Sequence, residues 1–250
     1  MISIPNSPGF GWTIRRSVRL IWENLGLVVL ISALTTIAAL PAISLTIVGL
    51  GMPPVHRLIT LSGAFLCWVL LVPSAQFAGA ELALRAIRGE ERDVFQFFKA
   101  FKQGYVDRLG IGAIRSIFYP AVFANVQFYF HLSKSAGLIS TVVAFYALSI
   151  WLVWGMYLYA VKIYAPRIES DALPSTNKLA WLFVASSVAY SFGMLAMLLV
   201  VTIALGVTGI GLALLAPGIW AMVSAQATYD QFLRFSLIKD DLLSGNDVDK

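Results

Sequence analysis

Long apolar stretches separated by short charged ones dominate the chain. Six of these stretches reach about 20 residues or more, the length of helix that crosses the ~30 Å hydrocarbon core of a bilayer. Backbone amides in lipid need internal hydrogen-bond partners, so each stretch is predicted to be a helix. The pattern therefore predicts an all-α polytopic membrane protein with six transmembrane helices, at residues 24–48, 58–84, 109–130, 136–161, 179–205 and 210–233.

Short recurring sequence motifs suggest that the six spans form three similar hairpins. Related four-residue motifs occur at the start of or within the first, third and fifth spans: Glu23-Asn-Leu-Gly26, Asp107-Arg-Leu-Gly110 and Tyr190-Ser-Phe-Gly193. A nearly constant spacing between such motifs is typical of internal repeats. Proline interrupts helical hydrogen bonding, so we expect kinks at Pro73 and Pro217.

Composition supports the membrane assignment. The chain is 59% hydrophobic and 12% charged, with a mean hydropathy of +0.80, whereas soluble domains carry about 25% charged residues. These values exclude a soluble enzyme and a nucleic-acid-binding domain, and the single Cys67 excludes a disulfide scaffold. Segments between the spans are too short for separate domains, so residues 1–250 are predicted to be a single membrane domain, with 240–250 as a flexible cytoplasmic tail.

The distribution of positive charge predicts the orientation. Fifteen of the 18 Lys and Arg residues fall in the two terminal segments and in the loops after the second and fourth spans. Loops on the other side hold only Arg57 and Lys134. Cytoplasmic loops collect Lys and Arg, so both termini are predicted to be cytoplasmic, and the turn near Gly209 is predicted to lie outside. This bias accounts for the net charge of +5 without a nucleic-acid partner.

Two of the charged stretches are amphipathic. Over residues 90–105 aromatic side chains recur at helical spacing, and the stretch includes Phe97, Phe98, Lys99, Phe101 and Lys102. Such a helix lies in the membrane interface, with its aromatic side chains in the acyl boundary and its Lys residues toward head groups. Docking of a protein partner on the same residues is the alternative. Residues 10–22 repeat the pattern more weakly.

Several polar residues are predicted to lie at membrane depth. Ionisable groups there normally face a partner or a wet cavity. We expect a cytoplasm-facing polar pocket between the second, third and sixth spans, built from Gln76, Glu81, Arg115, Gln226 and Asp230. In the structural alternative, Glu81 pairs with Arg85, Asp230 pairs with Arg234, and Arg115 extends toward lipid phosphates.

Familiar catalytic motifs do not occur in the sequence. It contains no Gly-x-x-x-x-Gly-Lys-Ser/Thr loop, no His-Glu-x-x-His, no Cys-x-x-Cys and no Gly-x-Ser-x-Gly. We therefore expect no catalytic residue, no metal and no cofactor.

The stretch from Pro73 to Gln103 resembles the YesL-type family of bacterial integral membrane proteins of unknown function. The resemblance lies in Pro73-Ser-Ala-Gln76, in the exit Arg88-Gly-Glu90 and in the aromatic segment Phe95-Gln-Phe-Phe-Lys-Ala-Phe101. The chain departs from the family over 43–71, where its first hairpin is longer. The resemblance implies a bacterial plasma (inner) membrane protein whose relatives accompany carbohydrate-uptake genes.

Three functions are compatible with these features. The leading hypothesis is a non-enzymatic inner-membrane protein that takes part in, or is accessory to, solute transport, with carbohydrate implied by the resemblance. Its partners would be the lipid bilayer and an ABC-type permease or another membrane protein. An intramembrane enzyme acting on a lipid or lipid-linked sugar, using Glu81 or Asp230 as acid or base, is the second. A scaffold that docks a cytoplasmic partner on residues 95–101 is the third.

Overall fold

The computed structural model describes residues 9–90, 92–103, 105–164 and 176–235, and these residues form ten helices. The all-α class is thereby confirmed for the described part of the chain. The predicted tail at 240–250 lies outside it. The helices are α1 (Phe10–Glu23), α2 (Leu25–Leu50), α3 (Pro54–Ile87), α4 (Val94–Lys102), α5 (Tyr105–Leu132), α6 (Lys134–Tyr164), α7 (Thr176–Ser186), α8 (Val188–Val207), α9 (Ile210–Leu214) and α10 (Ala216–Arg234).

Four helices are long and apolar enough to cross a membrane: α2, α3, α6 and α8. They make a multi-pass membrane protein the natural class for this chain. The other two predicted spans correspond to α5 and to α9 with α10, which carry more polar residues, among them Arg115 and Asp230.

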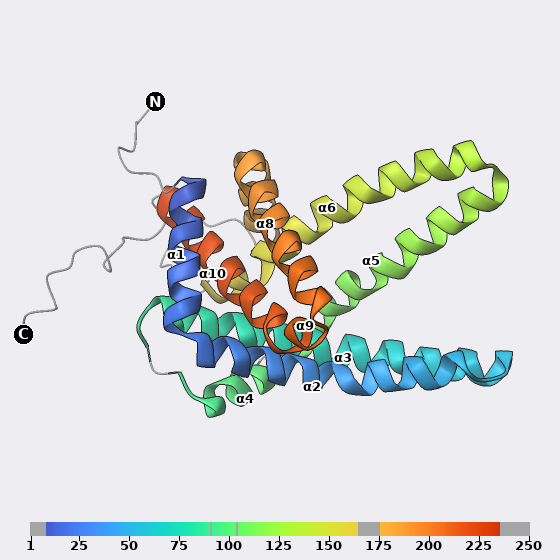
Figure 1. The fold of residues 1–250 in the computed structure, drawn as a ribbon, viewed down its shortest axis with the longest axis horizontal. Coiled ribbons are helices and arrows are strands. Elements are labelled where there is room, and N and C mark those ends of the chain that lie inside the picture. The colour runs from blue at the N-terminus through green and yellow to red at the C-terminus, as the bar shows by residue number, and fades with distance from the viewer. Residues whose placement is uncertain (1–8, 91, 104, 165–175, 236–250) are drawn as a thin grey trace, which may run out of the picture.

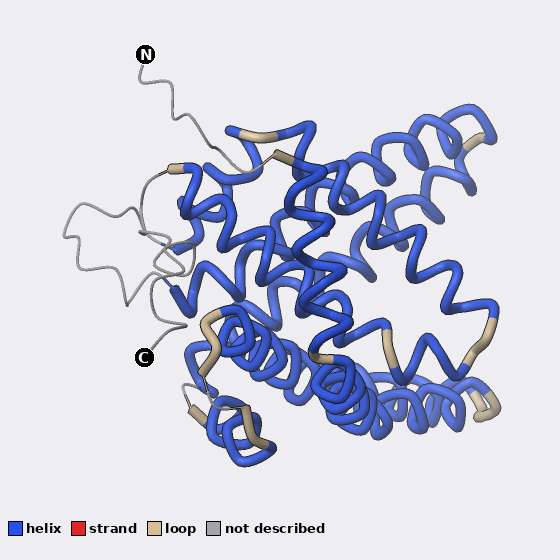
Figure 2. Tube along the Cα trace, turned by 60° about the vertical axis from the view of Figure 1, so that its left-hand side comes forward, coloured by secondary structure: helices blue, strands red, loops and turns tan. Residues whose placement is uncertain are grey.

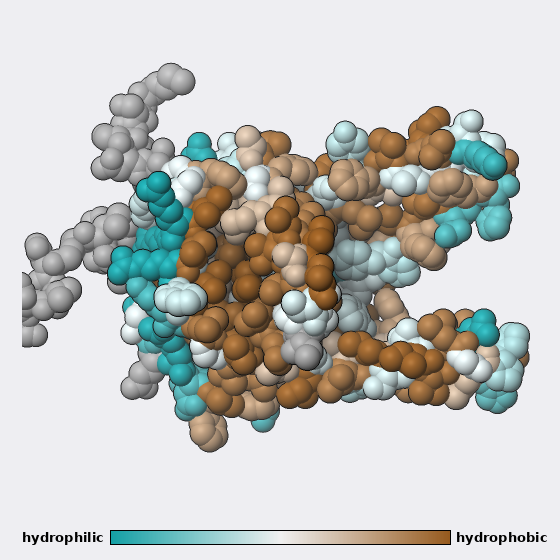
Figure 3. All heavy atoms as spheres, in the orientation of Figure 1, coloured by the Kyte–Doolittle hydropathy of each residue, from teal (hydrophilic) through white to brown (hydrophobic). Residues whose placement is uncertain are grey.

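Two long hairpins, α2–α3 and α5–α6, project in the same general direction and diverge toward their tips (Figure 1). Hydrophilic residues gather at the end of the molecule where α1 lies and again at the two tips, with apolar surface between them (Figure 3). This three-zone pattern is the one expected of a chain that spans a bilayer.

The third hairpin, formed by α7 and α8 followed by α9 and α10, is interrupted twice. Ser187 separates α7 from α8, and Leu215 separates α9 from α10. The second break directly precedes Pro217, which occupies the first turn of α10, where proline is tolerated. By contrast α3 continues as a helix through Pro73.

The turn of the third hairpin lies level with the middle of α2. The Thr36 hydroxyl donates to the carbonyl oxygen of Ala213 at 2.8 Å. Helix α2 continues from there to Leu50, about 21 Å further along its axis. The third hairpin, which turns at Gly209, therefore ends well short of the tips of the other two, as Figure 1 also shows.

Close packing of small residues joins the third hairpin to the first. Gly218 of α10 donates its backbone N–H to the Ser32 hydroxyl at 2.8 Å. A side chain at Gly218 would overlap the carbonyl oxygen of Val28. Figure 2 shows the arrangement of the helices from a second direction. Buried residues concentrate in the C-terminal halves of α3, α6 and α10, which lie toward the hydrophilic end of the molecule where α1 lies. We call this the charged end. The hairpins are anchored to one another there.

Candidate binding cavity

A cavity of about 570 Å³ lies between the two long hairpins and the end of the third. Its wall comes from α2, α3, α5, α6, α9 and α10, so residues far apart in the sequence meet there. Gly209, which has a positive φ of 61°, is part of this wall. The turn predicted to lie in an outer loop therefore borders the cavity.

Arg115 is the one cationic side chain among the residues that line the cavity. Its guanidinium carbon lies 4.9 Å from the centre of the Tyr159 ring, a cation–π arrangement. The guanidinium also packs against Gly155, where the space of a Cβ would lie 2.7 Å from Nη2. The absence of a side chain at Gly155 therefore gives Arg115 its position.

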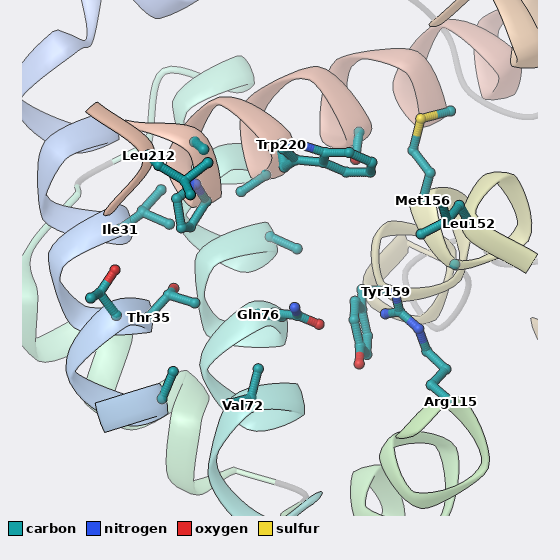
Figure 4. A pocket seen from close by; sticks show the side chains of 18 of the residues that line it. Ile31, Thr35, Val72, Gln76, Arg115, Leu152, Met156, Tyr159, Leu212 and Trp220 are labelled. Atoms are coloured by element: carbon teal, nitrogen blue, oxygen red, sulfur yellow. The ribbon is translucent and has the colours of Figure 1, made fainter. Parts of the chain in front are cut away.

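Other polar groups surround this guanidinium. Gln76 is the only exposed position between Val72 and Leu84, and its amide points toward Tyr159 and Arg115 (Figure 4). Exposure in the middle of a buried helix means that Gln76 faces the cavity.

Three polar atoms of the described cavity-lining residues form no hydrogen bond of good geometry, although Tyr119 and Tyr159 lie close enough to the Arg115 guanidinium to interact with it. Arg115 Nη1, the Tyr159 hydroxyl and the Thr35 hydroxyl are buried and have no hydrogen-bond partner among the described residues. Buried polar groups normally find a partner in protein, water or ligand. The cavity wall thus offers a cation and hydrogen-bonding groups to an occupant.

The five residues of the predicted polar pocket lie in three places. Gln76 and Arg115 both line the cavity. Glu81, Gln226 and Asp230 are not among its lining residues. Arg85 Nε donates to Glu81 Oε1 at 3.2 Å, the pair proposed in the structural alternative, and Gln226 Nε2 donates to Asp230 Oδ1 at 2.7 Å.

Gln226 and Asp230 belong to a separate buried polar cluster that joins α1, α6, α8 and α10. It includes hydrogen bonds between the Tyr190 and Thr13 hydroxyls at 3.1 Å and between the Tyr157 and Ser191 hydroxyls at 2.8 Å. In the same region Arg234 Nη1 donates to the Ser187 hydroxyl at 2.9 Å. These bonds connect the helices at the charged end and include the break between α7 and α8.

Helix α4 divides its aromatic residues between two faces. Phe97 is buried and its ring stacks on Phe101 at 6.4 Å. Phe95 and Phe98 are exposed, at 80% and 55%. Lys99 and Lys102 are exposed as well. The prediction that Phe97, Phe98 and Phe101 enter the interface together therefore changes: Phe97 packs on the protein, and Phe98 is the member of the stripe that faces outward.

The exposed face of α1 carries an ion pair outside the apolar zone. Arg19 Nε donates to Glu23 Oε1 at 2.6 Å. This hydrogen bond, together with the charge of Glu23, raises the pKa of Arg19. The Arg19 side chain therefore stays charged on this exposed helix face.

Thr35 and Tyr159 were not selected by sequence reasoning, although both line the cavity. Tyr159 lies four residues after Gly155, a spacing that places the two on one helix face. That spacing, together with an arginine on the preceding predicted span, was the available signal. Within the described residues no cluster of three or more His, Cys, Asp or Glu could hold a metal ion.

No protein-family model, no curated protein and no solved structure matches this chain.

Proposed function

We propose that the chain is a bacterial inner-membrane protein of six spans, with both termini in the cytoplasm, that takes part in solute transport by binding an anionic solute in its cavity. The observation that carries the proposal is the Arg115 guanidinium at the cavity wall, with a buried Nη1 that has no partner among the described residues. Arg115 lies ten residues after α5 begins at Tyr105, about 15 Å along the helix.

Electrostatics supports an anionic occupant. A charged side chain inside a bilayer costs about 2.5–3.5 kcal/mol even on the insertion scale, so it normally faces a counter-charge or a wet cavity. The Tyr159 ring offsets part of that cost. Glu81 and Asp230 do not line the cavity. An anionic solute bound there would therefore supply the counter-charge for Arg115.

The interrupted third hairpin supports a transport role. Non-helical backbone at membrane depth is tolerated where it is buried in protein or lines a water-filled cavity. The turn at Gly209 borders the cavity beside the middle of α2. Substrate sites of secondary transporters are commonly formed where helices are broken near the bilayer midplane.

The other hypotheses have less support. An intramembrane enzyme would need an acid or base at the cavity, and neither carboxylate singled out for that role lines it. A scaffold role would use the exposed Phe95 and Phe98 of α4, which equally suit a membrane surface. An ABC-type permease as partner and the relationship to the YesL-type family both stay predictions.

Native mass spectrometry of the protein purified in mild detergent tests the proposal. The wild-type chain is expected to retain an anionic small molecule, and Arg115→Gln is expected to lose it. Arg57→Gln is the matched control, because Arg57 is exposed at the tip of the α2–α3 hairpin and should not affect retention. Equal retention by Arg115→Gln and wild type would contradict the proposal.

A further inference from the structure

We propose that the solute is an amphiphile, with an anionic head at Arg115 and an apolar chain that extends between the two long hairpins toward their tips. This substrate class deepens the proposed function and rests on it. The relevant arrangement is one charged corner at Arg115 in a cavity whose wall is mostly apolar and continues toward the open space between the hairpins.

The charged group of the wall has two polar neighbours, whereas the hydroxyl groups of Thr35, Thr36 and Ser224 lie elsewhere on it. Arg115, Tyr159 and Gln76 lie together, with the Gln76 amide directed at the other two (Figure 4). Arginine presents several N–H donors and suits a phosphate or a carboxylate. An anionic head placed here would give Arg115 Nη1 the acceptor that the described residues do not provide.

Most of the remaining wall is apolar or aromatic. It includes Ile31, Val72, Leu152, Met156, Leu212 and Trp220. Ligands rich in hydroxyl groups, such as a free carbohydrate, would lose hydrogen bonds to water along this surface without replacing them. An alkyl chain would instead gain by burial against it.

The apolar wall extends toward the hairpin tips. Ile43 lies eight residues beyond Thr35 on α2, and Trp68 lies eight residues before Gln76 on α3. Both positions are about 12 Å further toward the tips along their helices. The two side chains line the cavity while 42% and 39% exposed. Figure 3 shows the hollow between the hairpins opening in the same direction.

The test uses the full chain in phosphatidylcholine nanodiscs, with empty nanodiscs to correct for partition into lipid. The direct probe is dodecyl phosphate with a bromine at the chain end. Inorganic phosphate and dodecanol carry no bromine, and their affinities are measured by competition with this probe. Bromine quenches tryptophan fluorescence at short range, so saturable quenching reports the chain end near Trp68, and Trp68→Phe should remove most of the signal.

The amphiphile inference expects dodecyl phosphate to bind at least about tenfold more tightly than either other probe. Arg115→Gln should weaken this binding about 10- to 100-fold, the range for a hydrogen bond to a charged group, whereas Arg57→Gln should leave it unchanged.

The other outcomes contradict either the amphiphile inference alone or the proposed function as well. If inorganic phosphate binds as tightly as dodecyl phosphate, the site takes a small free anion: the amphiphile inference fails while the proposed function stands. If dodecanol binds as tightly as dodecyl phosphate and Arg115→Gln has no effect, the cavity holds apolar chains without regard to charge, and both fail. Saturable binding by none of the three probes would also overturn the amphiphile inference, and the retained solute would then decide the proposed function separately.

Discussion

Replacing Gly155 by alanine should move the Arg115 guanidinium while leaving the helix bundle intact. The new Cβ would lie 2.7 Å from Nη2 and 2.9 Å from Cζ, whereas ordinary contact begins at 3.4 Å. The guanidinium must therefore shift by about 0.7 Å. It is the far end of a flexible side chain, so this shift requires no movement of α5 against α6.

The effect on binding should exceed the effect on stability. Hydrogen bonds to charged groups contribute about 1.5–3 kcal/mol, and a displaced donor retains only part of this. We expect about a tenfold loss of affinity for the anionic ligand, equivalent to ~1.4 kcal/mol. Alanine gains ~1 kcal/mol in helix propensity, while a weakened cation–π contact with Tyr159 loses ~0.5–2 kcal/mol. The free energy of unfolding should therefore change by no more than about 1 kcal/mol.

Binding of dodecyl phosphate and thermal unfolding, both measured in nanodiscs, separate the two effects. Gly26→Ala is the matched control, because a Cβ at Gly26 meets no described atom within 4 Å, and its affinity should equal that of wild type. Unchanged affinity in Gly155→Ala, together with lost affinity in Arg115→Gln, would show that the position of the guanidinium does not determine binding. A Gly155→Ala chain that no longer folds would refute the packing argument.

Three further predictions concern the fold. Gly218→Ala should lower the free energy of unfolding by at least ~1–3 kcal/mol, since its Cβ would overlap the backbone of Val28; a melting temperature equal to wild type would refute this close approach. Tyr190→Phe should cost about 1 kcal/mol by removing a buried hydrogen bond, and a neutral effect in thermal unfolding would mean that the bond adds nothing. In a chain lacking its own cysteine, a cysteine at Lys134 should be labelled from outside intact cells and one at Gly89 should not; the reverse labelling would invert the topology.

The helical spans could be predicted because the bilayer constrains them strongly. An apolar stretch of sufficient length has helix as its only backbone solution in lipid, so α2 at Leu25–Leu50 lies within two residues of the predicted 24–48. The breaks at Ser187 and Leu215 were not predicted as interruptions, although Pro217 marked the second region. Serine and leucine are compatible with a helix interior, and tertiary packing therefore determines where these helices end.

The site was only partly predictable because depth along a helix does not specify direction around it. Gln76 and Glu81 lie only about 7.5 Å apart along α3, but five residues correspond to a rotation of about 140°. Gln76 therefore reaches the cavity while Glu81 pairs with Arg85. Gln226 and Asp230, four residues apart, share a face and bond to each other. Thr35 comes from another hairpin, and its place at the cavity follows only from the packing of the whole bundle.

The length of the hairpins relates the cavity to the thickness of the membrane. The apolar part of α3, residues 58–84, extends about 40 Å, while the hydrocarbon core measures ~30 Å. Hydrophobic matching is then met by a tilt of this helix or by thickening of the bilayer around it. The two hairpins diverge, so greater tilt in a thin bilayer separates their tips, and a thick bilayer brings them together. A change in membrane thickness is therefore expected to change the width of the space between the two hairpins.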